Sequence, residues 1–132
     1  MKEQIIECVP NISEGHDLKK INTIANVVKT IEGVKLLDID PGKATNRTVI
    51  TFVGEPNKVI EAAFLLIKKA SELIDMTNQT GEHPRFGATD VCPLIPIANI
   101  SMDLEKKNNF IKIKNFDLTE GNDFISIKDL NF

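Results

Sequence analysis

Apolar and polar residues follow two rhythms along this chain, one typical of strands and the other of helices. Four short segments rich in β-branched residues predict strands: 4–10, 34–40, 47–53 and 91–97. Two longer segments carry apolar residues three and four positions apart, which predicts amphipathic helices over 17–32 and from Pro56 onward. The buried face of the second helix is expected to comprise Val59, Ile60, Ala63, Phe64, Ile67, Ala70 and Ile74.

The predicted order, β-α-β-β-α-β, matches the ferredoxin-like split unit, an α+β sandwich with two helices on one face of a sheet. Periodicity does not fix the order of the strands. Pro93 and Pro96 in the fourth strand predict an edge, or a strand that exposes one side to a ligand. Residues 1–102 are expected to form the folded unit. Apolar patterning is weaker over 103–132, which we expect to be a divergent tail with short strands or loose attachment.

Composition narrows the function classes. The chain has 132 residues, enough for one domain, and a net charge of −3, which argues against a nucleic-acid-binding surface. Its apolar runs are too short to span a bilayer and its first residues form no signal core, so we expect a cytoplasmic protein. Cys8 and Cys92 are then expected to be buried reduced thiols. The two histidines lie far apart, which gives no metal-ligand spacing.

The segment GEHPRFGATD, residues 81–90, holds the candidate chemistry. His83 can exchange a proton near neutral pH, and Glu82 could orient it, although a loop histidine is often simply exposed. Among 14 lysines the chain has two arginines, Arg47 and Arg85. Both lie where predicted elements meet, and the planar guanidinium binds carboxylates bidentately. The alternative is that each arginine holds a loop by bonding to backbone carbonyls.

Two acids follow the second predicted strand. Strict alternation puts Val34, Leu36, Asp38 and Asp40 on one strand face, so that this face turns acidic towards its end. Such acids are often solvated turn formers. They could also meet the loop that carries His83 at the rim of the sheet.

Three long stretches identify a family resemblance: ECVPNISEG, LLDIDPGKATNRTVITFVGEP and LIDMTNQTGEHPRFGATDVCPLIPI. They resemble the N-terminal subdomain of glutamate formimidoyltransferase, which also occurs in formimidoyltransferase-cyclodeaminase, over about residues 3–102. The resemblance implies a transferase that moves a formimidoyl group from N-formimidoyl-L-glutamate to N5 of tetrahydrofolate, in histidine degradation. Tetrahydrofolate would be a substrate, and no metal is implied.

The resemblance also implies roles for single residues. His83 matches the family's catalytic base, and Asp40 in DIDPG matches an acid near that histidine. The geometry of the guanidinium, rather than the resemblance, suggests that Arg47 and Arg85 bind the carboxylates of glutamate or of the folate tail. Glu82 and Asn46 complete the candidate substrate-binding set.

Members of the family continue for about two hundred residues beyond the stretch that resembles this chain, into a second subdomain that closes the site. We therefore expect this chain to be an incomplete part of the enzyme, with a second chain or self-association supplying the missing wall. Two alternatives are a non-catalytic folate-binding or regulatory protein and a truncated gene product.

Overall fold

The computed structural model describes residues 3–78, 87–99 and, for the backbone, 124–126. Within these residues six strands form one antiparallel sheet. The strands are β1 (Ile5–Cys8), β2 (Asn11–Ile12), β3 (Val34–Gly42), β4 (Arg47–Gly54), β5 (Thr89–Ala98) and β6 (Phe124–Ser126). The helices are α1 (Leu18–Asn26), continued by the 3₁₀ helix η1 (Val27–Thr30), and α2 (Pro56–Leu73), followed by the 3₁₀ helix η2 (Met76–Asn78).

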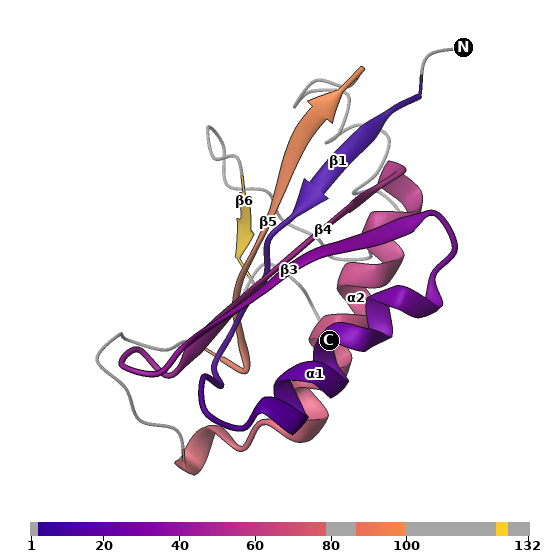
Figure 1. The fold of residues 1–132 in the computed structure, drawn as a ribbon. Helices are drawn as coiled ribbons and strands as arrows, with labels where there is room; N and C mark the ends of the chain where they lie inside the picture. Colours follow the sequence, from indigo (N-terminus) through magenta and orange to yellow (C-terminus); the bar gives the residue numbers. More distant parts are fainter. Residues whose placement is uncertain (1–2, 79–86, 100–123, 127–132) are drawn as a thin grey trace.

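The sheet has the strand order β3-β4-(β1, β2)-β5-β6. Strands β1 and β2 lie in line between β4 and β5, interrupted at Pro10, which has no N–H to donate. The backbone stays connected across the break, because Val9 N donates to Pro93 O (3.1 Å) and Ile50 N donates to Pro10 O (3.0 Å). Figure 1 shows α1 and α2 together on one side of the sheet. This arrangement confirms the predicted α+β sandwich.

Two predictions, one of a strand and one of a helix, change in detail. Strand β5 is not an edge over Val91–Pro93, because β6 pairs with it there, on the side away from β2. The predicted helix over 17–32 divides into α1 and η1. It begins at Asp17, whose carboxylate accepts a hydrogen bond from Lys20 N (3.1 Å). It ends before Gly33, which has φ of +90°.

The core lies between the sheet and the helices. Its fully buried members include Ile6, Ile21, Ile24, Phe52 and Leu66. Cys8 and Cys92 are buried thiols, as predicted, and form no disulfide, with their Sγ atoms 3.4 Å apart. None of the helices within residues 3–78 and 87–99 has the length and hydropathy needed to cross a membrane.

The prediction that Phe64 belongs to the core is wrong, since its side chain is 42% exposed. The buried face of α2 is centred on Val59, Ala63 and Leu66, which recur three and four positions apart. Phe64 lies about 100° further round the helix than Ala63, at the border of that face.

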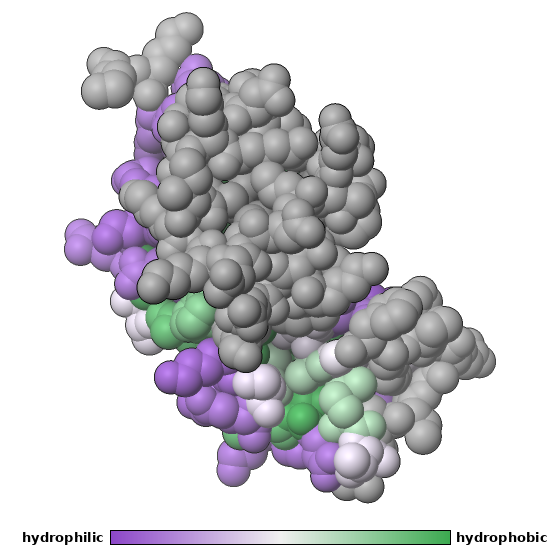
Figure 2. Space-filling view, turned by 180° about the vertical axis from the view of Figure 1, so that it is seen from behind, coloured by the Kyte–Doolittle hydropathy of each residue, from purple (hydrophilic) through white to green (hydrophobic). Residues whose placement is uncertain are grey.

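Apolar groups also reach the surface elsewhere in the molecule. Figure 2 shows them among hydrophilic side chains on the side seen from behind.

Candidate functional site

The sheet face opposite α1 and α2 carries the polar residues of the candidate site, and a β-bulge in β3 brings two acids to it. Leu36 pairs with Phe52, but the next pair joins Asp38 to Thr51, so that Leu37 is one extra residue. Beyond the bulge Ile39 pairs with the buried Ile50.

The bulge corrects the prediction for the two acids. Asp38 and Asp40 do not share a face with Leu36, because the extra residue reverses the alternation. Opposite residues of an antiparallel pair share a face, so Asp40, paired with Val49, lies on the face opposite α1 and α2, which we call the helix-free face because no described helix covers it. Both carboxylates are exposed.

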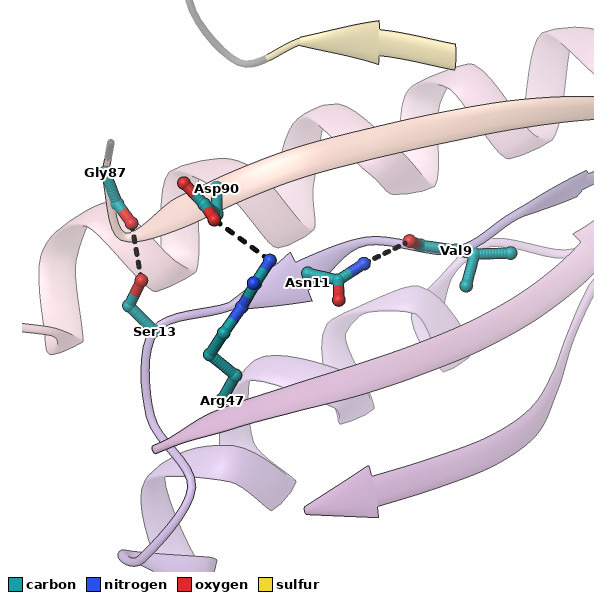
Figure 3. Close-up of polar contacts among 6 residues, drawn as sticks. All are labelled: Val9, Asn11, Ser13, Arg47, Gly87 and Asp90. Atoms are coloured by element: carbon teal, nitrogen blue, oxygen red, sulfur yellow. Dashed lines mark hydrogen bonds and ion pairs between the residues drawn. The ribbon is translucent and has the colours of Figure 1, made fainter. Parts of the chain in front are cut away.

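Arg47 begins β4 on the same face, two residues before Val49. Its Nη2 lies 2.9 Å from Oδ2 of Asp90, with side-chain exposures of 13% for Arg47 and 3% for Asp90. Figure 3 shows the two side chains pointing towards one another across the chain at Asn11. Asp90 is the extra residue of a second bulge, because Ile12 pairs with Thr89 and Asn11 pairs with Val91. Removing either partner of such an ion pair strongly lowers protein stability, because the other charge is left buried and unpaired.

The loop after β2 forms hydrogen bonds with the start of β5 and with the turn before β4. Ser13 N donates to Ala88 O (2.8 Å) and Ser13 Oγ donates to Gly87 O (2.7 Å), as Figure 3 shows for the hydroxyl. Gly15 N donates to Oδ1 of Asn46 (2.8 Å) in the turn between β3 and β4. The start of β5 and the start of β4, which carries Arg47, are thereby held against one loop.

Asn46 is 5% exposed and has φ of +51°, a left-handed conformation that asparagine tolerates. Its side-chain oxygen accepts the hydrogen bond from Gly15, so this atom is engaged within the protein. Substrate binding by Asn46 stays a prediction. Glu82, His83 and Arg85 lie outside the described residues.

The loop also begins α1. Both backbone N–H groups of His16 and Asp17 donate to Oε2 of Glu14, at 3.0 and 3.1 Å. The carboxylate of Glu14 therefore binds donors at the start of the helix, where a negative charge is favourable. Residue His16 itself is exposed. Within residues 3–78 and 87–99, no group of three or more His, Cys, Asp or Glu side chains could hold a metal ion.

Sequence reasoning missed Asp90 and Ser13. A signal for Asp90 was present, because an acid directly before the apolar run VCPLIPI needs a cationic partner if it is buried. Ser13 carried no comparable signal, since serine is common in turns of every kind.

The strand order and the two bulges define a class: a ferredoxin-like α+β subdomain with polar side chains on its helix-free face. A model of the "Formiminotransferase domain, N-terminal subdomain" matches residues 5–108. The chain belongs to this family.

Relatives with assigned names support the same family. The chain is 52% identical over 100 residues to the formimidoyltransferase-cyclodeaminase of Rattus norvegicus, covering 76% of this chain and 18% of that protein. It is 51% identical over 98 residues to the glutamate formimidoyltransferase of Streptococcus pyogenes serotype M1, covering 74% of this chain and 33% of that protein. Its identity to the formimidoyltransferase-cyclodeaminase of Dictyostelium discoideum is 51% over 100 residues, covering 76% and 19%. The chain thus spans a third or less of the length of these relatives.

Proposed function

We propose that this chain supplies one wall of an active site that transfers a formimidoyl group from N-formimidoyl-L-glutamate to N5 of tetrahydrofolate. The observation that carries the proposal is the family match over residues 5–108, which includes both the segment with His83 and the described helix-free face. The chain spans a third or less of the length of its relatives, so the rest of the site would come from polypeptide beyond the matched segment, in the same chain or in another.

The proposed reaction needs one base at the nucleophile. N5 of the reduced folate attacks the amidine carbon of the substrate, and His83 takes the proton that N5 loses. The bond between that carbon and the glutamate nitrogen then breaks, and the proton passes to the leaving nitrogen, which departs as the amine of glutamate. A histidine suits both transfers, because its ordinary pKa is close to neutral pH.

Asp40 would orient the imidazole or stabilise its charged form. Its exposed position on the helix-free face supports this role, because the carboxylate is not engaged within the core. Two other acids of the site differ from it. The carboxylate of Asp90 contacts Arg47, and Glu82, a candidate substrate-binding residue, lies outside the described residues.

Carboxylate recognition would fall to Arg47 and Arg85, since both substrates carry carboxylates. Arg47 is held at the start of β4 on the same face as Asp40, which supports its place in the site. Asn46 precedes it, and its side-chain oxygen accepts a hydrogen bond from Gly15 N, which fixes the side chain beside Arg47.

The test is a transfer assay with both substrates. The purified chain is assayed alone and again with the polypeptide that follows the matched segment in the Streptococcus pyogenes relative. We expect transfer in the second assay, with kcat lowered about 10²- to 10⁴-fold by His83→Asn, because a general base contributes about that much. Substrate affinity should change less, since the proton moves only in the transition state.

The matched control is His16→Asn, because His16 is the other histidine of the chain and lies exposed in the loop before α1. This variant should keep the wild-type kcat. A His83→Asn enzyme with near-normal kcat would remove His83 from the mechanism. Folate binding without transfer in any combination would contradict the proposed reaction and favour a non-catalytic binding protein.

A further inference from the structure

The ion pair between Arg47 and Asp90 is buried on a face of the sheet that α1 and α2 do not cover. Asp90 is 3% exposed and Arg47 13%, whereas Asp38 and Asp40 on the same face are exposed. Desolvating two charges is costly, and a pair in the interior is often no more stabilising than apolar residues of the same volume. Stability alone is therefore a weak reason for this pair.

A bulge in the backbone of β5 directs the carboxylate of Asp90 towards Arg47. The bulge at Asp90 sets it out of register between Thr89 and Val91, and Figure 3 shows its side chain directed at the guanidinium of Arg47. Bulges are frequent beside binding sites, where they redirect a side chain. Arg47 has several rotatable bonds, and a partner 2.9 Å from Nη2 removes much of that freedom before any ligand arrives.

The Nε–H donor of Arg47 is not used in the ion pair with Asp90. Its Nε is buried and has no hydrogen-bond partner, although a buried N–H that stays unpaired is costly. The guanidinium carries five N–H donors in one plane, and the contact with Asp90 is made at Nη2. Donors in this fork that Asp90 does not use match the geometry of a second carboxylate.

We infer that Asp90 is a positioning residue for carboxylate recognition: it holds the guanidinium of Arg47 on the helix-free face, and Arg47 there binds a carboxylate of the glutamate substrate. The inference rests on the proposed function for the identity of that substrate. Asp90 itself touches no substrate. Its negative charge also balances Arg47 while the site is empty, so that no lone charge is buried.

The experiment uses the ¹⁵N-labelled chain and the side-chain Nε–H signals of arginine in its NMR spectrum. The sequence has two arginines, so two signals are expected, and Arg47→Lys identifies the signal of Arg47 by its loss. The probe is N-formimidoyl-L-glutamate, added up to about 50 mM, because a single guanidinium in one wall of the site should bind only in the millimolar range. We expect the Arg47 signal to shift and saturate.

Asp90→Asn should raise the dissociation constant read from that signal about tenfold or more, because a charge-assisted contact loses its fixed geometry. Asp90→Glu keeps the charge but lengthens the side chain by one methylene. It should weaken binding several-fold, since the guanidinium is displaced by about 1 Å, a displacement that matters in a preorganised site. The control is Glu61→Gln, which removes a carboxylate charge from an exposed position of α2, on the other side of the sheet, and should leave the affinity unchanged.

Three results would overturn the inference. They are an Arg47 signal that the probe does not move, a wild-type affinity in Asp90→Asn, and a wild-type affinity in Asp90→Glu, which decides the matter if Asp90→Asn does not fold. The transfer assay separates this from the proposed function. Binding through Arg47 without transfer would support the carboxylate site and contradict the proposed reaction. Transfer that does not depend on Asp90 would support the reaction and contradict the inference about Asp90.

Discussion

Gly15→Ala is expected to be among the most damaging single-methyl additions to this protein, because the loop after β2 lies against the turn between β3 and β4. A Cβ at residue 15 would come within 2.3 Å of Gly42 O, 2.8 Å of Arg47 N and 2.9 Å of the Asn46 Cα. Real Cβ contacts essentially never fall below 3.0 Å, so the two backbones must separate by about 0.7 Å (3.0 less 2.3). All three neighbours are backbone atoms, which cannot turn aside as a flexible side chain does.

Overpacking of this kind costs about 1 to 3 kcal/mol, and the separation also stretches the hydrogen bond from Gly15 N to Asn46, worth about 1 kcal/mol. Alanine also lowers the conformational entropy of the unfolded chain, which stabilises the folded state by about 0.4 to 1 kcal/mol. We therefore expect a net loss of about 2 kcal/mol in the free energy of unfolding, measured by urea denaturation with the slope m unchanged.

Gly33→Ala is the matched control. Its Cβ would meet only Lys58 Cγ at 3.7 Å, so there is no overlap, but its φ of +90° strains an alanine by about 1 to 2 kcal/mol. The reasoning is refuted if Gly15→Ala costs less than Gly33→Ala. It would mean that the loop and the turn are not in contact as described.

The remaining predictions concern the core and the ligand. Phe52→Ala should lower the free energy of unfolding by about 3 to 5 kcal/mol, because Phe52 is fully buried, whereas the 42% exposed Phe64 should cost less than about 1 kcal/mol when changed to Ala. Equal losses in urea denaturation would show that the buried face of α2 is misassigned. The isolated chain should bind a stable reduced folate no more tightly than about the millimolar range, since one wall leaves most of the ligand in water. A micromolar dissociation constant in calorimetric titration would show that the chain supplies an enclosed site by itself.

The elements of this fold were predictable because their signals are local. The strand β4 is a run of β-branched residues, and α2 begins with proline at a position where proline is favoured. The border of the helix face was harder to predict. Phe64 follows the buried Ile60 by four positions, so periodicity places it on the buried face, and only the packing of α2 on the sheet decides where that face ends.

The site was predictable in part. Arg47 stood out because arginine is rare in this chain, but its partner Asp90 comes from a strand far along the sequence. Such a pairing depends on strand order, which periodicity does not contain. The same holds for Ser13, whose two hydrogen bonds to Gly87 and Ala88 exist only because β2 and β5 are neighbours.

The acids of β3 show how a departure from alternation builds the site. With strict alternation, the face that buries Leu36 would also bury Asp38 and Asp40 under the helices, and burying unpaired carboxylates is prohibitive. One extra residue, Leu37, resolves the conflict, because Leu36 and Ile39 then both face the core while both acids face away from it. The doublet Leu36-Leu37 is the visible trace of that insertion, since strict alternation leaves room for one apolar residue there and the sequence has two. A second bulge, at Asp90, directs another acid at Arg47, so two irregularities in pairing, on opposite sides of β4, determine which charges the helix-free face presents.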